Sequence, residues 1–215
     1  MTTNVKSKVL HEVNASLRSK VNGTPVILSN ASHLHGLAAG LKHGEVIIEG
    51  DAGDYLGVLN AGATIRGTQN AGNYLADNMN SGTIIVKGDV GFGAAQYCYG
   101  GAVIIHGNAG DFTATMNKGA VIIIKGDVGD EVGTYMLKGD LIVVGNAGDN
   151  FANYLIRGSV YLGGQYRSLG HNTKLVPMTG EDITKLHAYF DQYGIQADPA
   201  GFKKILAASE KPFYH

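Results

Sequence analysis

The sequence predicts an all-β solenoid: a single-stranded right-handed parallel β-helix of about seven coils, with short α-helical caps at its N- and C-terminal ends. Three observations predict it: a fixed repeat, glycines at constant places inside the repeat, and short β-branched runs between them. The repeat units begin at glycines 44, 62, 82, 101, 119, 139 and 158, which gives steps of 18, 20, 19, 18, 20 and 19 residues. The order 18, 20, 19 occurs twice, so a block of three units is itself repeated. In a solenoid, each unit buries its apolar face only against its neighbours.

A second spacing of glycines marks one corner of the coils. The pattern G-x-x-G-x-x-x-G is complete at Gly50, Gly53 and Gly57, and again at Gly126, Gly129 and Gly133. Other units carry alanine at the third place, so this position holds a very small residue. Glycine permits positive φ at a corner and close backbone approach between stacked coils. We therefore predict these glycines as a structural corner motif, and we expect the Asp or Asn after the first glycine to bond its own turn backbone.

The runs between the corners have the length and composition of strands. They read VIIE, TIIVK, AVIIH, AVIIIK and DLIVV, and their β-branched residues favour β-structure. About nineteen residues per coil allow two or three short strands joined by tight turns. We expect the following apolar residues to stack inside the prism: Val46, Ile48, Ile84, Val86, Val103, Ile105, Val121, Ile123, Leu141 and Val143.

The second part of each unit carries aromatic and methionine residues at similar offsets from the second glycine. They are Tyr55, Tyr74, Met79, Tyr97, Phe112, Met116, Tyr135, Met136, Phe151 and Tyr154. One interpretation is stacked packing on one face of the prism. The other is an aromatic docking face for a partner protein. The sequence leaves both interpretations open.

The repeat divides the chain into three predicted regions. Residues 1–43 form an N-terminal cap with a short helix and a degenerate first coil, residues 44–164 form the β-helix, and residues 165–215 form a C-terminal helical cap and tail. The N-terminal helix is predicted over 13–23, with Asn14 as its N-cap and a glycine as its stop. Atypical terminal coils are expected because the end of a solenoid exposes unpaired backbone groups.

The C-terminal region shows two segments with helical patterns. Residues 181–193 have apolar residues at helical spacing, acids at the start and a glycine after the end. Asp198 and the following proline predict the start of a second helix over 199–207. The tail ASEKPFYH, which ends at His215, is short and partly aromatic. These helices are expected to cap the last coil or to dock against another subunit.

Composition excludes several classes of protein. The net charge of −1 and the isoelectric point of about 6.7 leave no basic stripe for nucleic acid. Cys98 is alone, so there is no disulfide framework and no cysteine metal cluster. The longest aliphatic run, residues 120–124, is far too short to span a bilayer. The first residues show no apolar signal-peptide core, and we expect a cytoplasmic protein.

The sequence shows no catalytic constellation. There is no HExxH and no G-x-S-x-G, and the corner motif is not followed by the helix that a phosphate-binding loop requires. The Gly-Asp strings have twice the period of calcium-binding nonapeptides. His33, His35 and His43 lie close in sequence and leave a metal site as a minor alternative. We therefore expect no catalytic, cofactor-binding or metal-binding residues in this chain.

The coils resemble the C-terminal GXGXG β-helix domain of the glutamate synthase large subunit. The resemblance covers about residues 13–208 and reaches both flanks. The segments NASHLHGLAAGLKHGEVIIEGDAGDYLG and GIQADPAGFKKILAASEK are similar to the beginning and end of freestanding members. Such members occur in methylamine–glutamate N-methyltransferase (N-methylglutamate synthase). One of the subunits of formylmethanofuran dehydrogenase is a cousin on the same β-helix.

The resemblance implies a non-catalytic scaffold subunit of a glutamate-synthase-like amidotransferase complex, an assembly of the oxidoreductase or transferase type. It implies two partners in a hetero-oligomer: a class II glutamine amidotransferase-like subunit and an FMN glutamate-synthase-like subunit. FMN and iron–sulfur clusters are then expected on the second partner. Alternatives are the β-helix subunit of a formylmethanofuran dehydrogenase/formyltransferase complex, or an independent β-helix enzyme or binding protein. The acceptor substrate, the particular complex, the stoichiometry and the surface that docks partners stay open.

Overall fold

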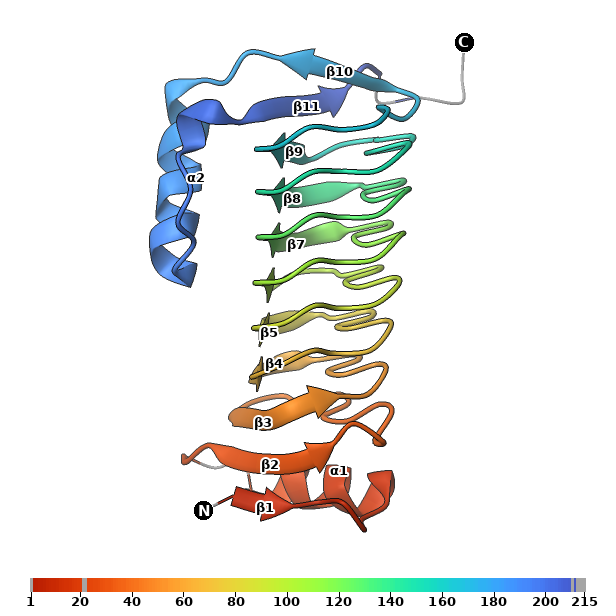
Figure 1. The fold of residues 1–215 in the computed structure, drawn as a ribbon, viewed down its shortest axis with the longest axis vertical. Helices are drawn as coiled ribbons and strands as arrows, with labels where there is room; N and C mark the ends of the chain where they lie inside the picture. Colours follow the sequence, from red (N-terminus) through yellow and green to blue (C-terminus); the bar gives the residue numbers. More distant parts are fainter. Residues whose placement is uncertain (1, 21–22, 210, 212–215) are drawn as a thin grey trace.

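The computed structural model describes residues 2–20, 23–209 and 211, which form an elongated prism of stacked coils (Figure 1). The parallel strands follow in chain order: β1 (Thr2–Asn4), β2 (Val26–Ala31), β3 (Glu45–Ala52), β4 (Ala61–Gly67), β5 (Ser81–Val86), β6 (Ala102–Ile105), β7 (Lys118–Ile124), β8 (Lys138–Val143) and β9 (Ser159–Leu162). Each strand pairs in parallel with the next. The predicted right-handed parallel β-helix of about seven coils is confirmed. The region boundaries at residues 43 and 164 stay predictions.

Each coil contains one regular strand and one isolated bridge to its neighbours, and backbone hydrogen bonds also join the turn segments of successive coils. Isolated bridges join Ala52 to Ala71 and continue up the stack. The chain then enters a turn segment in which alternate residues have left-handed φ, as at Tyr55 (57°), Gly57 (69°) and Leu59 (58°). A regular strand cannot continue through left-handed residues. The coils therefore contain fewer strands than the two or three that the sequence predicts.

Columns of aliphatic residues fill the interior of the prism. One column runs in register through Val46, Ile65, Ile84, Val103, Ile122, Leu141 and Val160, all fully buried. The prediction that Val121 and Ile123 point inward is wrong, because Ile122 and Ile124 occupy the inward positions of this coil. The coil that begins at Gly119 has one more residue before its corner than the preceding coil. A shift of one residue turns every side chain to the opposite face of the strand. The other predicted inward residues lie in the main core.

Helix α1 (Leu10–Lys20) closes the N-terminal end of the stack, beside β1 and β2 (Figure 1). The prediction that Asn14 is its N-cap is wrong, because Asn14 lies inside the helix and is buried. Its Nδ2 donates to the carbonyl of Gly36 at 3.0 Å, and its Oδ1 accepts from the N–H of Ala38 at 2.8 Å. In the next coil, the N–H of Gly57 bonds the preceding coil instead. Asn14 thus supplies the acceptor that the first coil lacks.

The C-terminal end of the stack is closed by β-structure. Asp198 caps only a short 3₁₀ turn, η1 (Pro199–Gly201), and the chain continues as β11 (Lys203–Ala207). The predicted helix over 199–207 is therefore wrong. β11 pairs antiparallel with β9, and β10 (Thr173–Val176) pairs antiparallel with β11. The open edge of β9 would leave unpaired backbone groups, and this requirement outweighs local helix propensity.

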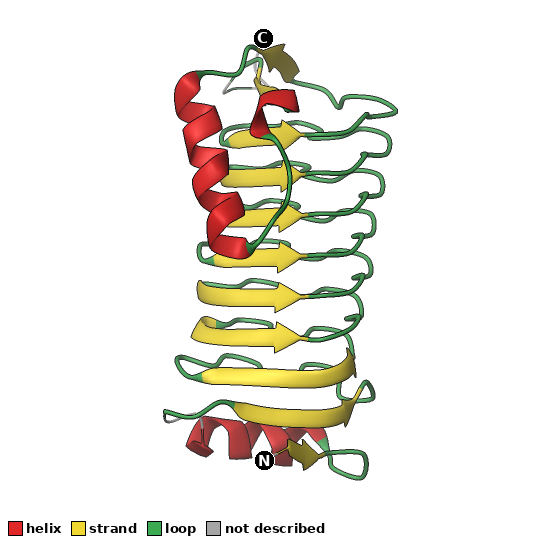
Figure 2. Ribbon diagram, turned by 60° about the vertical axis from the view of Figure 1, so that its left-hand side comes forward, coloured by secondary structure: helices red, strands yellow, loops and turns green. Residues whose placement is uncertain are grey.

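Helix α2 (Gly180–Tyr193) confirms the predicted helix over 181–193 and lies along the outer face of the C-terminal coils (Figures 1 and 2). A capping box starts it: the Thr179 hydroxyl accepts from the N–H of Asp182, and the Asp182 carboxylate accepts from the N–H of Thr179. Gly194 ends it with a left-handed φ of 65°.

Some predictions fall outside the part of the chain that the structure describes. They are residues 21–22 of the N-terminal helix and residues 210 and 212–215 of the tail, which include His215. Among the described residues, no helix is long and apolar enough to cross a bilayer.

Candidate docking surfaces

The described residues contain no group of three or more His, Cys, Asp or Glu side chains placed to hold a metal ion. The histidines that left a metal site open contact separate partners. His33 Nε2 lies 3.2 Å from the carbonyl oxygen of Lys8, and His35 Nδ1 accepts from the N–H of Asp54 at 3.0 Å. Because this nitrogen is an acceptor, its 3.3 Å approach to the Asp54 carboxylate is not a pair of opposite charges.

Cys98 lies in an environment that suppresses thiol chemistry. It is fully buried, and its Sγ donates to the carbonyl of Ala76 at 3.2 Å. Burial raises the pKa of the Cys98 thiol to about 12. Only the thiolate is a nucleophile or a metal ligand, so Cys98 contributes packing.

A cavity of about 300 Å³ lies between α1 and the first strands. Its lining combines apolar residues such as Val13 and Leu17 with the acidic Glu12 and the basic Lys8 and Lys20. Charges of both signs at one rim do not select an ionic ligand. The cavity therefore points to no particular chemistry.

The second glycine of the corner motif has no room for a side chain. A Cβ added to Gly53 would lie 2.8 Å from the carbonyl oxygen of Ser32, and one added to Gly129 would lie 2.8 Å from the backbone nitrogen of Asp111. Real Cβ atoms do not approach backbone so closely. Neither glycine has positive φ, so close approach between coils, and not conformation, is what these positions demand.

At the first and third places of the motif, either left-handed φ or close contact with another coil restricts the residue. Gly50 has a φ of 96°, whereas a Cβ on Gly126 would lie 2.6 Å from a carbonyl oxygen of the preceding coil. At the third place, Gly57 and Gly133 have φ of 69° and 77°, and the alanines of other coils share this left-handed conformation. A Cβ on Gly57 would lie 2.5 Å from Ile84 Cδ1. The third place thus faces the core, where only the smallest residues fit.

An alternating ladder of Asp and Asn joins the coils at this corner. Its members are Asp51, Asn70, Asp89, Asn108, Asp127 and Asn146. Each Oδ1 accepts from the backbone N–H of the next member, at 2.6 to 3.1 Å. The prediction that these side chains bond their own turns is wrong, because the stacked coil presents its N–H directly to them. Alternation places carboxylates two coils apart, which limits repulsion between like charges.

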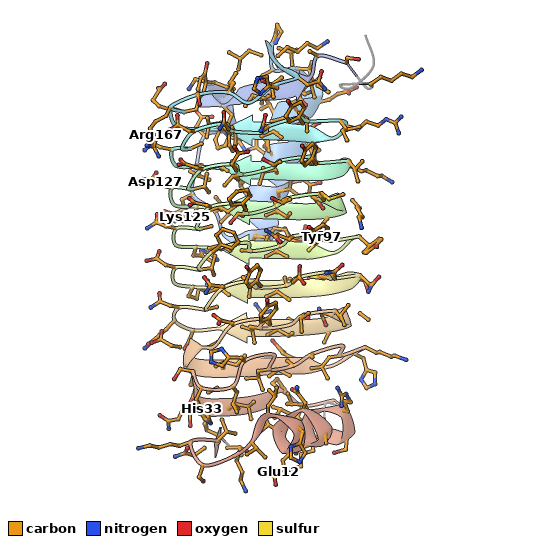
Figure 3. All side chains as sticks on the ribbon, turned by 90° about the vertical axis from the view of Figure 1, so that its right-hand side faces the viewer. Glu12, His33, Tyr97, Lys125, Asp127 and Arg167 are labelled. Atoms are coloured by element: carbon orange, nitrogen blue, oxygen red, sulfur yellow. The ribbon has the colours of Figure 1, made fainter. Side chains whose placement is uncertain are left out.

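The turn segments of the N-terminal coils carry an exposed line of rings, which we call the aromatic row: Tyr55, Tyr74, Phe92 and Phe112. Successive ring centroids are 4.8, 5.6 and 5.2 Å apart. Tyr55 is 39%, Phe92 38% and Phe112 36% exposed, and the neighbouring Leu59 is 52% exposed. Figure 3 faces this turn side, with Tyr97 labelled on it. Of the aromatic and methionine residues for which packing and docking were both open, three point into the core: Met79, Met136 and Phe151.

The turn segments of the C-terminal coils are more polar. Glu131 accepts from Asn150 Nδ2 at 2.8 Å and from Asn153 Nδ2 at 3.1 Å. Tyr154 stacks between Tyr135 and a histidine, with centroids 5.5 and 5.2 Å away. Side-chain hydrogen bonds between coils thus replace much of the apolar surface found lower in the stack.

The outer face of the sheet carries one in-register column: Ile27, Ile47, Arg66, Ile85, Ile104, Ile123, Ile142 and Tyr161. Its last four members are fully buried, in a second core formed with α2. Leu186 and Phe190 of α2 pack into this core, together with Ile195 and Phe202. Helix α2 therefore belongs to the fold of this chain.

Charged groups fasten α2 to the sheet. Lys185 Nζ lies 2.8 Å from Asp140, and Lys204 Nζ lies 2.7 Å from Asp182. The hydroxyl of Tyr161 donates to the same Asp182 carboxylate at 2.7 Å. Burial alone raises the pKa of Asp182, but hydrogen bonds from Lys204, Tyr161 and Thr179 outweigh it and hold this pKa well below its usual value. This cluster was not predicted from the sequence, in which T-x-x-D before a helical pattern is its local signal.

Comparison with known proteins gives one result that spans the fold. A family model described as GXGXG motif matches residues 3–207, from β1 to β11. No curated protein gives a significant match.

Proposed function

The chain belongs to the GXGXG motif family, which is associated with glutamate synthase-like proteins, and from that premise we propose that it is a non-catalytic scaffold subunit of an amidotransferase complex of the glutamate synthase or N-methylglutamate synthase type. It joins a class II glutamine amidotransferase-like subunit to an FMN and iron–sulfur subunit in the cytoplasm. The observation that carries the proposal is the family match over residues 3–207.

The solid interior of the prism supports this role. The inward column is fully buried and aliphatic from Val46 to Val160, so the interior of these coils is filled by side chains. Charged residues face the surface or, like Asp182, pair within the fold. A rigid body of this kind positions other proteins at fixed distances.

The proposal is tested by reconstitution with the two partner subunits. The chain is purified alone and after co-expression with both partners, and each sample is analysed by gel filtration with flavin and iron assays. We expect one complex that contains all three chains, with flavin and iron that follow the FMN subunit. A stoichiometric flavin or cluster in the isolated chain, or glutamine turnover by it, would overturn the proposal.

Deleting residues 180–215 would not separate docking from folding. The deletion removes β11, which pairs with β9, and uncovers Ile104, Ile123 and Ile142. Substitutions at exposed positions are therefore the appropriate tests of partner binding.

A further inference from the structure

We propose that the aromatic row binds a basic amphipathic helix of a partner protein. The proposal rests on the proposed function only in requiring a partner. It deepens that function by naming the surface and the kind of segment that it receives.

The fold does not require aromatic residues at these positions. Tyr55, Tyr74 and Phe112 occupy a place in the turn that has left-handed φ in successive coils. Glu131 and Asn150 occupy the same place higher in the stack, with φ of 57° and 54°. Left-handed φ suits asparagine or glycine better than a bulky ring. Rings that are partly exposed at a place where other coils carry Glu or Asn indicate a use outside the folding of this chain.

The arrangement of the rings favours side chains of another protein over a flat ligand. The rings of Tyr55 and Tyr74 stack on each other at an interplanar angle of 13°, and the edge contact of Tyr74 with Phe92 continues the row. Tyr55 and Tyr74 cover one face of each other, whereas a sugar or a base stacks on a free ring face. The exposed surface is therefore a narrow apolar strip, which suits side chains of another protein.

The turns that carry the strip have negative charge. The turn segments 53–60, 72–79, 91–98 and 110–117 contain Asp54, Asp77 and Asp111 but no Lys, Arg or His. The basic groups next to these turns are fewer: Lys118, whose Nζ lies 5.7 Å from the centroid of the Tyr97 ring, and His35, whose Nδ1 accepts from the N–H of Asp54. An apolar strip with an excess of acids complements an apolar stripe flanked by lysine or arginine.

The spacing of the row fits a helix that runs along the stack. Residues three and four apart on a helix lie about 5–6 Å from each other, and the rings are 4.8 to 5.6 Å apart. Helix α2 already lies along the stack (Figure 1), with Leu186 and Phe190 buried in the second core against the outer face of the sheet. Four coils at about 4.8 Å each span about 19 Å, which corresponds to about three and a half helical turns.

A second copy of this chain does not offer such a helix within the described residues. The apolar side of α2 is buried against its own sheet. Val13 and Leu17 of α1 are buried as well, and its exposed residues are polar or small, such as Glu12 and Arg18. The occupant is therefore a helix of a different protein.

The first experiment replaces three rings with asparagine, which suits left-handed φ: Tyr55→Asn, Tyr74→Asn and Phe112→Asn together. The matched control is Tyr135→Asn with Tyr154→Asn, at left-handed positions of the C-terminal coils. Binding of each chain to the purified amidotransferase-like and FMN subunits is measured by calorimetry. We expect the triple variant to weaken binding about tenfold or more and the control less than twofold. Equal binding by wild type and triple variant would overturn the proposal.

The second experiment identifies the occupant directly. The full chain with the photoreactive residue p-benzoylphenylalanine at position 74 is produced in the native host and irradiated, and cross-linked peptides are mapped. A helical segment with an apolar stripe and flanking Lys or Arg supports the docking site; if it belongs to a protein unrelated to amidotransferase complexes, the docking site stands and the proposed function fails. A second copy, an acidic or extended segment, or no cross-link would overturn the docking site.

Discussion

On the outer face of the sheet, one column of residues is buried in the C-terminal half of the prism and open in the N-terminal half. Ile104, Ile123 and Ile142 are fully buried beneath α2, whereas Ile47 and Ile85 stand at equivalent positions and keep part of their surface exposed. The turn face differs as well, with the aromatic row below and hydrogen-bonded amides above. The two halves nevertheless share one register and one kind of aliphatic interior.

This difference shows which positions the repeat controls. An inward residue contacts the coils above and below, so the same steric demand recurs in every unit. An outward residue contacts whatever segment covers that coil, and each coil is covered differently. The interior is therefore uniform along the stack, while the exterior is specific to each half.

The largest expected effect comes from Asp182, whose contacts with Lys204 and Tyr161 hold α2 against the C-terminal half of the prism. Asp182→Ala removes the partner of Lys204 and Tyr161 in a buried site, so we expect a loss of about 4 kcal/mol in the free energy of unfolding. Urea unfolding measures this loss. The control is Glu181→Ala, at an exposed position in the same helical turn, which we expect to cost about 0.5 kcal/mol. Equal losses for the two variants would contradict the buried cluster.

The same carboxylate predicts a pH dependence. The pKa of Asp182 is lowered on folding, so its contribution is complete above the unfolded value of 3.8 and is lost as the pH falls below it. The difference in urea midpoint between wild type and Asp182→Ala should therefore narrow between neutral pH and about pH 2. A constant difference would show that the carboxylate is not held ionised by the fold.

The two halves are compared directly by one substitution made in each. Ile142→Ala leaves a cavity in the second core and is expected to cost about 3 kcal/mol, whereas Ile47→Ala, at the partly exposed equivalent position, should cost about 1 kcal/mol. Thermal unfolding of both variants measures the ratio. Similar costs would mean that the N-terminal half of the face is covered in solution.

The corner motif should matter in both halves. Gly129→Val places a side chain against the backbone of the preceding coil, so we expect a loss of about 2 kcal/mol or more, and Gly53→Val should behave alike. Gly180→Ala is the control, because a Cβ there meets nothing within 4 Å. An unchanged melting temperature for Gly129→Val would refute the close approach between coils.

The smallest effect concerns the alternating ladder. Asn108→Asp places a third carboxylate between Asp89 and Asp127, and Asn70→Asp does the same between Asp51 and Asp89. We expect each to cost about 0.5 kcal/mol at low ionic strength, and less at high salt because exposed charges are screened. Costs that do not change with salt would indicate that repulsion between carboxylates is not the cause.

The sequence alone determined the coil. The recurring glycines and aliphatic runs predicted the solenoid, its coil length and most inward residues, because these properties depend on contacts that repeat at a fixed distance along the chain. The helix over 181–193 was also predictable, since its capping residues and apolar spacing are local. The candidate docking surface was predictable only as one of two alternatives for the aromatic residues.

Only the tertiary structure decided the exceptions. Val121 and Ile123 face outward because pairing with neighbouring strands, and not the distance from the first glycine, sets their register. Asn14 completes a turn 22 residues away, and residues 203–207 become a strand because β9 has an open edge. Each of these outcomes depends on the groups that another segment brings alongside, and local sequence does not carry that information.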